Sequence, residues 1–233
     1  MTRKLLLGNC LDHLRTFADD RFKATITSPP YNMNLRIRNG KYCKRTDISK
    51  ISAKYDFFDN AMPIDEFYHF HLAVLGELIR TSELVFYNIA VVTGSKRAFF
   101  KLIGDYNEYL KDIIVWDKGH GQPAMQHGVL NRQSELILVF DKTNAISREF
   151  SSCNFARGTL SDTWQINPQR SKVPGHRAVF PEELVERILL NFTNEGDTVY
   201  DPFMGSGTVL RVAERFNRKV VGSEINKAYF DHY

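Results

Sequence analysis

Apolar runs of strand length alternate with amphipathic segments along most of the chain. The apolar runs lie at residues 4–7, 24–27, 84–92, 111–116, 135–140, 198–200 and 219–222. Apolar residues at spacings of three and four, which are typical of helices, recur between them at 11–17, 63–78, 95–110, 181–189 and 205–216. This alternation predicts a doubly wound α/β domain with right-handed crossovers. We expect loops at 32–60, 117–133 and 142–172, where polar residues show no clear period.

The apolar run that ends at Thr27 leads into the sequence Ser28-Pro29-Pro30-Tyr31. Two consecutive prolines fix φ and lack N–H donors, and each keeps the preceding residue out of the helical region. The segment should therefore form a stiff, extended elbow that presents a hydroxyl, free carbonyl groups and an aromatic ring. Such an elbow suits a flat ring that carries an amino group. An ordinary Pro-Pro turn in which Tyr31 covers the core is the alternative, and these four residues alone do not decide between them.

A second polar segment follows the run at 198–200, where Asp201 precedes a turn with Gly205 and Gly207 and then a helix. Glycine permits positive φ and a close approach of the backbone to a ligand. The next strand ends in an acid, Glu224, at the position where nucleoside-binding α/β folds hold a ribose diol. The turn lacks the third glycine of the dinucleotide fingerprint and the lysine of the P-loop. We therefore expect it to bind a nucleoside with a small polar tail, with a plain glycine-rich turn as the alternative.

The composition is that of an ordinary globular protein, with 43% hydrophobic and 25% charged residues, and fits one domain over residues 1–233. No apolar run approaches the length needed to span a bilayer. The apolar stretch near the N-terminus is too short for a signal peptide, so we expect no membrane contact. The cysteines, Cys10, Cys43 and Cys153, are far apart and lack metal-ligand spacing. They favour a reducing, cytoplasmic location and argue against structural zinc.

Basic residues are concentrated directly after the elbow, although the net charge is only +4. Between residues 32 and 55, seven lysines and arginines are opposed by Asp47 alone. This segment predicts contact with a polyanion, and a merely solvated loop is the alternative.

The elbow and the glycine turn, Asp201-Pro202-Phe203-Met204-Gly205-Ser206-Gly207-Thr208, together resemble the two principal motifs of the amino-group DNA methyltransferases. The catalytic motif comes first and the cofactor motif last, as in the permuted β class of that family. Residues 175–184 and Gly8-Asn9-Cys10 resemble two further cofactor-side segments, although Asn9 replaces the usual acid and Arg177 a common proline. The resemblance implies the mixed, mostly parallel seven-stranded sheet of the S-adenosylmethionine-dependent methyltransferases.

The resemblance further implies S-adenosylmethionine as cofactor and double-stranded DNA as substrate. A base flipped from the duplex would stack on Tyr31, and its amino group would donate to Ser28 Oγ and the Pro29 carbonyl as it attacks the methyl group. Methylation at cytosine C5 is excluded, because it requires a Pro-Cys pair and the three cysteines follow Asn, Tyr and Ser. In this family a serine at the first motif position favours N4 of cytosine, and N6 of adenine is the alternative.

The expected site residues follow from these motifs. The catalytic set is Ser28, Pro29, Pro30 and Tyr31. The cofactor set is Asn9, Cys10, His176, Phe180, Asp201, Phe203, Gly205, Gly207, Thr208 and Glu224. The DNA-binding set is Arg36, Arg38, Lys41, Lys44 and Arg45, and no metal site is expected.

The resemblance to this family suggests a restriction–modification system with a cognate endonuclease, and it is compatible with a homodimer. Base-reading side chains are expected in the loops 117–133 and 142–172. Methylation of RNA or of protein glutamine, and a DNA-binding relic without activity, are the alternative functions.

Overall fold

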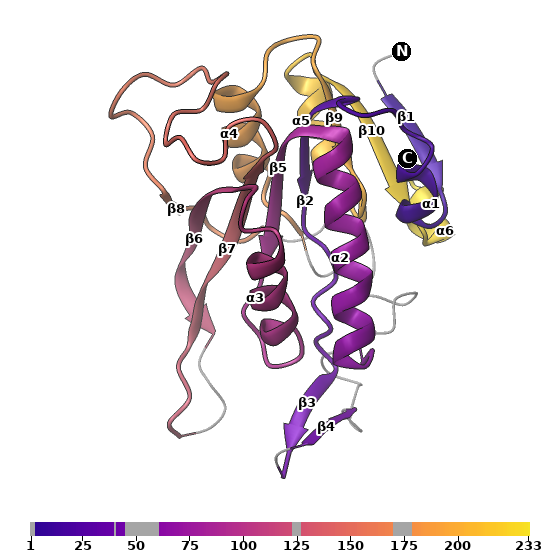
Figure 1. The fold of residues 1–233 in the computed structure, drawn as a ribbon, viewed down its shortest axis with the longest axis vertical. Helices are drawn as coiled ribbons and strands as arrows, with labels where there is room; N and C mark the ends of the chain where they lie inside the picture. Colours follow the sequence, from indigo (N-terminus) through magenta and orange to yellow (C-terminus); the bar gives the residue numbers. More distant parts are fainter. Residues whose placement is uncertain (1–2, 40, 45–60, 123–126, 170–178) are drawn as a thin grey trace.

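A computed structural model of the protein describes residues 3–39, 41–44, 61–122, 127–169 and 179–233 (Figure 1). The strands of the main sheet are β1 (Arg3–Leu7), β2 (Phe22–Thr27), β5 (Ser82–Ile89), β6 (Leu110–Gln122), β7 (Arg132–Asp141), β8 (Thr163–Gln165), β9 (Thr198–Asp201) and β10 (Lys219–Glu224). Within the described residues they form one eight-stranded sheet in the order β1-β10-β9-β2-β5-β7-β6-β8.

The sheet is mostly parallel, as the sequence predicts. β7 pairs antiparallel with both β5 and β6, whereas the other neighbours pair in parallel. The expected count of seven strands is exceeded by one, because the three-residue β8 joins the edge beside β6. A strand this short leaves little periodic signal in a sequence.

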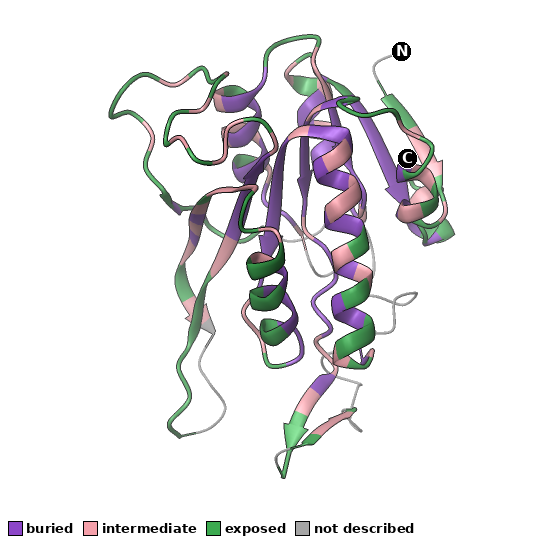
Figure 2. Ribbon diagram, viewed as in Figure 1, coloured by how far each residue is buried: buried purple, intermediate pink, exposed green. Residues whose placement is uncertain are grey.

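Helices cover both faces of the sheet. One core contains side chains of α1 (Cys10–Leu14), α2 (Ile64–Thr81) and α3 (Lys96–Asp105). The other contains those of α4 (Glu182–Phe192) and α5 (Thr208–Arg215), with the short α6 (Lys227–Phe230) packed beside it. Figure 2 shows the central strands and the inward helix faces as buried. None of the helices in the described ranges is long and apolar enough to cross a membrane.

The near-continuous apolar sequence of β5 follows from this layering. Leu84 and Phe86 belong to the core beneath α4 and α5, whereas Val85 and Tyr87 belong to the core beneath α2 and α3. Successive side chains of a strand point to opposite faces, so a strand buried on both faces needs apolar residues at every position.

The basic segment after the elbow is not a loop throughout, which corrects the expectation for 32–60. Leu35–Arg38 and Lys41–Lys44 form the antiparallel hairpin β3–β4, which projects from the lower end of the molecule in Figure 1. Residues 45–60 lie outside the described part of the chain. The expected loop 117–133 is also shorter than predicted, because β6 continues to Gln122 and β7 begins at Arg132.

Candidate active site

The carboxyl ends of β2, β9 and β10 open onto one pocket. Ser28 and Pro30 of the elbow line it together with the turn that follows β9 and the end of β10. Eight expected cofactor residues line the same pocket, namely Asn9, Cys10, Phe180, Asp201, Phe203, Gly205, Thr208 and Glu224. Gly207 lies next to two lining residues, Ser206 and Thr208, and His176 lies outside the described residues. The two motifs, 173 residues apart in sequence (201 − 28), therefore meet in space.

The turn after β9 has a backbone that only glycine adopts freely. Gly205 and Gly207 have φ of +49° and +63°, which L-residues adopt only at a cost. Glu224 holds this turn, because one carboxylate oxygen accepts from the Gly205 amide at 2.7 Å and the other from the Asn226 amide at 2.8 Å. Burial raises the pKa of Glu224, and these backbone hydrogen bonds partly offset the shift.

Asp201 links the end of β9 to the end of β2. Its Oδ1 accepts from Thr27 Oγ1 at 2.9 Å and from the Phe203 amide at 3.1 Å. Burial raises the pKa of Asp201 to about 7, although both hydrogen bonds favour the charged form. This residue thus fixes the spacing between the elbow and the glycine turn.

The cofactor-side segment after β1 is shaped by a helix cap. Asn9 Oδ1 accepts from the Leu11 amide at 3.0 Å and caps α1. Burial raises the pKa of the Cys10 thiol to about 12, so this thiol is neutral near pH 7.

The Tyr31 ring is more buried than we expect of a ring on which a base can stack. Its side chain is 7% exposed, and its ring lies edge-on to Phe99 with centroids 6.4 Å apart. Its hydroxyl lies 2.6 Å from Ser28 Oγ. The stacking of a base on Tyr31 stays a prediction, and the hydroxyl has a polar role that the sequence did not suggest.

Two residues that sequence analysis missed complete the polar surroundings of Ser28. Asn88, near the end of β5, is fully buried, and Glu135 lies near the start of β7. Asn88 Nδ2 donates to Glu135 Oε2 and to the Tyr31 hydroxyl, both at 2.6 Å. The signal for Asn88 was its polarity inside an otherwise apolar run.

His71 supports the elbow from α2. Its side chain is 1% exposed, and its Nδ1 lies 2.5 Å from the Tyr87 hydroxyl. Burial lowers the pKa of His71 to about 3, partly offset by the Pro30 backbone, so the ring is neutral near pH 7. The sequence places His71 on the apolar face of a helix, and the structure adds its contact with the elbow.

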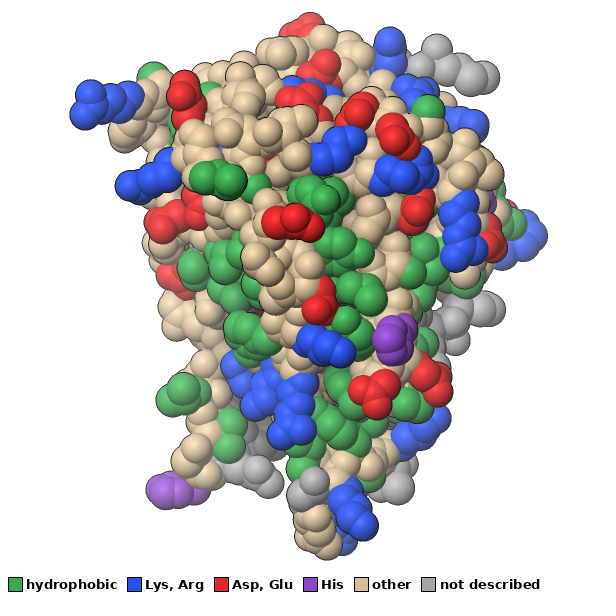
Figure 3. Space-filling view, in the orientation of Figure 1, with side chains coloured by type: hydrophobic (Ala, Val, Ile, Leu, Met, Phe, Trp, Pro, Cys, Tyr) green, Lys and Arg blue, Asp and Glu red, His purple; other side chains and the backbone are tan. Residues whose placement is uncertain are grey.

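Basic side chains lie at the same end of the sheet as the elbow. Arg38, Lys41 and Lys44 of the β3–β4 hairpin are exposed and Arg36 is half-buried, whereas Arg45 lies outside the described residues. Lys96, Arg97 and Lys101 on α3 are also exposed and were not expected. The Arg97 guanidinium lies 5.9 Å from the centre of the Tyr42 ring, and this contact links α3 to the hairpin. Figure 3 shows Lys and Arg side chains gathered in this lower region of the molecule.

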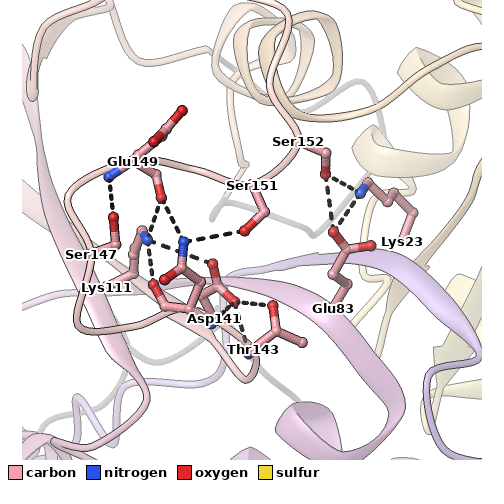
Figure 4. Close-up of polar contacts among 10 residues, drawn as sticks. Lys23, Glu83, Lys111, Asp141, Thr143, Ser147, Glu149, Ser151 and Ser152 are labelled. Atoms are coloured by element: carbon pink, nitrogen blue, oxygen red, sulfur yellow. Dashed lines mark hydrogen bonds and ion pairs between the residues drawn. The ribbon is translucent and has the colours of Figure 1, made fainter.

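The first part of the expected recognition loop 142–172 lies at the opposite end of the sheet. Asp141 pairs with Leu84 near the start of β5, whereas Ser28 follows the end of the neighbouring β2. Lys111 binds the Glu149 carbonyl at 2.6 Å and Lys23 contacts Ser152, so this segment is fastened to the sheet (Figure 4). Residues 142–152 therefore lie away from the pocket, and base reading by this part of the loop stays a prediction.

The later part of the same loop runs toward the end of the sheet that carries the pocket. β8 runs parallel to β6, and Gln165 pairs with Asp117 toward the end of the sheet that carries the pocket. Residues 166–169 continue from there, and Arg170 and Lys172 lie outside the described residues.

Comparison with known proteins identifies related sequences and folds. A family model described as DNA methylase matches residues 22–233. The Type II methyltransferase M.BglII of Bacillus subtilis is 24% identical over 264 residues, which cover 98% of this chain and 67% of that protein. The Type II methyltransferase M.HpaI of Haemophilus parainfluenzae is 26% identical over 249 residues, which cover 99% of this chain and 73% of that protein.

Solved structures share the fold at low sequence identity. The cytosine-N4-specific PvuII DNA methyltransferase superposes with a TM-score of 0.71 at 17% identity, covering 97% of this chain and 83% of its own. The M1.HpyAVI–SAM complex superposes with a TM-score of 0.63 at 19% identity, covering 98% of this chain and 96% of its own.

Proposed function

Because the chain belongs to the N6/N4 family of DNA methylases, we propose that it transfers a methyl group from S-adenosylmethionine to the N4 amino group of cytosine at a specific site in double-stranded DNA. The observation that carries this proposal is the single pocket lined by Ser28 and Pro30 on one side and by Gly205 and Glu224 on the other. A methyl donor and an acceptor amine must meet in one such space.

The residues that line the pocket suit S-adenosylmethionine in their chemistry. Phe70, Phe180 and Phe203 supply apolar walls for an adenine ring. Glu224 supplies a buried carboxylate for a ribose diol, and the hydrogen bond that it accepts from the Gly205 amide fixes the backbone of the turn beside the ligand. When bound there, the cofactor supplies an electrophilic methyl group on a sulfonium. No metal is required for this chemistry.

The elbow suits the acceptor amine. The nitrogen lone pair of an exocyclic amine is delocalised into the ring, so the amine is a weak nucleophile. Hydrogen bonds from its two protons to Ser28 Oγ and to the Pro29 carbonyl would turn the nitrogen toward tetrahedral geometry. The prolines hold both acceptors in place, which makes catalysis chiefly a matter of positioning. Base flipping gives the amine access to this depth.

The serine at the first position of the elbow, Ser28, favours N4 of cytosine. Methylation of adenine at N6 by the same residues is the second candidate, since a hydroxyl acceptor does not by itself select a ring. The Type II names of the relatives support a place in a restriction–modification system.

The exposed basic residues of the β3–β4 hairpin and of α3 would contact DNA phosphates. Such contacts position a duplex without reading its sequence. The β6–β7 hairpin and residues 163–169 lie at the same end of the sheet and are the candidates for base reading.

The test is incubation with unmethylated bacterial DNA and S-adenosylmethionine, followed by mass spectrometry of the nucleoside digest. We expect N4-methylcytosine from the wild type and a loss of at least about 100-fold in Ser28→Ala, within the range of a directly acting catalytic group. N6-methyladenine would refute the cytosine assignment. Neither modified base, with cofactor still bound, would refute DNA methylation.

A further inference from the structure

Ser28 is the pocket-lining end of a partly buried polar network that reaches β7. The network runs from Ser28 Oγ to the Tyr31 hydroxyl at 2.6 Å and from that hydroxyl to Glu135 Oε2 at 3.1 Å. Asn88 Nδ2 lies 2.6 Å from both Tyr31 and Glu135 and 3.4 Å from Ser28 Oγ. Lys118 Nζ lies 2.5 Å from the other oxygen of Glu135.

The direction of each hydrogen bond follows from the donor inventory. A carboxylate paired with lysine has no proton to give, so Asn88 must present its amide nitrogen to Glu135, and Tyr31 must donate its only hydroxyl proton there. The Tyr31 oxygen is then left as an acceptor. Ser28, 2.6 Å away, donates its own proton to it.

The two Asn88 amide protons are directed at Glu135 and Tyr31, so the Ser28 oxygen receives only the long 3.4 Å contact from Asn88 Nδ2 and keeps a lone pair for a ligand. An exocyclic amine can donate to that oxygen only if the Ser28 proton is directed elsewhere. With Glu135 replaced by a group that can itself donate, Tyr31 could give its proton to Ser28, and the Ser28 proton would then be free to point at the amine.

We propose that Glu135, held by Lys118, is a positioning residue that acts through Tyr31 to keep Ser28 Oγ a hydrogen-bond acceptor for the target amine. This inference rests on the proposed function and adds two residues outside the elbow to it. Proton positions alone are concerned, and no covalent bond forms or breaks in the network.

The antiparallel direction of β7 makes this arrangement possible. Glu135 lies near the start of β7, next to Leu136, which pairs with Ile89 at the end of β5. In a sheet with β7 parallel to β5, the start of the strand would lie at the opposite end. The reversed strand thus brings an acid to the end of the sheet that carries the elbow.

The first test compares Glu135→Gln and Tyr31→Phe with the wild type. Glu135→Gln keeps the shape and removes the charge, and Tyr31→Phe keeps the ring and removes the hydroxyl. We expect kcat to fall at least about tenfold in each, which corresponds to about 1.4 kcal/mol, with Kd values for S-adenosylmethionine and DNA within about twofold. The double variant should lose no more than either single variant, because both changes interrupt one chain of bonds.

Glu83→Gln is the matched control. Glu83 also pairs with a lysine, Lys23 at 2.6 Å, but at the start of β5, away from the elbow (Figure 4). We expect its kcat to stay within about twofold of the wild type. Thermal unfolding of all variants would show whether each is folded.

A spectroscopic measurement tests the link without catalysis. In protein labelled with 3-fluorotyrosine, the fluorine resonance missing from Tyr31→Phe belongs to Tyr31. It should shift in Glu135→Gln and stay in place in Glu83→Gln.

The outcomes separate the two proposals. An unmoved Tyr31 resonance in Glu135→Gln, wild-type kcat in folded Glu135→Gln and Tyr31→Phe, or additive losses in the double variant would each overturn the positioning role. Absence of methyl transfer to DNA by the wild type would instead overturn the proposed function.

Discussion

Glu224 and Gly205 are joined by a 2.7 Å hydrogen bond from the glycine amide to the carboxylate, so the acid that ends β10 and the turn after β9 form one unit. The carboxylate that is proposed to hold the ribose therefore also holds the backbone against which the cofactor would lie. Loss of this side chain should affect both.

Glu224→Ala should weaken the binding of S-adenosylmethionine by at least about tenfold, because it removes a charge-assisted acceptor and frees the turn. Isothermal titration calorimetry would measure the change. Glu195→Ala, at an exposed position before β9, is the control and should bind as the wild type does. Equal affinities in the two variants would argue against the proposed role of Glu224.

Gly207→Ala should reduce both stability and cofactor binding. The residue has φ of +63°, and an added Cβ would lie 2.5 Å from Cζ of Tyr233. Positive φ alone costs about 1 kcal/mol for an L-residue, and the contact adds to it. Gly128→Ala measures the cost of positive φ without the steric contact, since Gly128 has φ of +75° but no atom within 4 Å of an added Cβ. Chemical denaturation should show the larger loss for Gly207→Ala, and Tyr233→Ala should restore part of it.

The motifs were recognisable in the sequence because each is a local run of residues with special backbone requirements. The network behind Ser28 was not, since it depends on β5 lying beside β7, which no local pattern states. Asn88 looks like one amide in an apolar strand, and Glu135 like the polar start of another. The burial of Tyr31 also depends on α3, whose Phe99 meets its ring.

The β3–β4 hairpin shows a different reason for a missed element. The alternation in Leu35-Arg36-Ile37-Arg38 has the period of a strand, but it spans only four residues within a strongly basic segment. Charge density there suggested a solvated loop, whereas the pairing with Lys41–Lys44 gives a defined ribbon.

The double variant Arg38→Ala/Lys41→Ala should weaken DNA binding at low salt and reduce the slope of log K against log salt concentration by about 0.9 for each lost phosphate contact. Fluorescence anisotropy with a labelled duplex over a salt series would measure both quantities. Lys219→Ala removes an exposed charge at the start of β10, away from the pocket, and should leave the slope unchanged. An unchanged slope in the double variant would remove the hairpin from the interface.

The pH dependence of folding should carry the signature of His71. Its pKa is about 3 in the folded protein and 6.5 when unperturbed, so the unfolded state binds more protons between these values. Stability should therefore fall as pH decreases from about 6.5, by up to about 1.4 kcal/mol per pH unit for this group.

His71→Phe should flatten this dependence relative to the wild type, as measured by urea unfolding between about pH 4 and 6.5. Asp201 works in the opposite direction, because its folded pKa of about 7 exceeds the ordinary 3.8 and its contribution is lost as pH rises through this range. The difference in unfolding free energy between the wild type and His71→Phe at each pH cancels the Asp201 contribution, because both proteins contain Asp201. Parallel curves would show that His71 is protonated in the folded protein.

The two outer strands of the sheet affect whether the protein aggregates at high concentration. An open strand edge is a template on which a second chain can add, and long apolar edges lead to aggregation. β1 begins with two exposed charged residues, Arg3 and Lys4, and the Arg3 guanidinium lies 3.7 Å from Glu214 of α5. β8 offers only three residues at the other edge. Both edges therefore resist strand addition, so the protein should remain dispersed at concentrations at which an unprotected parallel sheet would assemble into fibres.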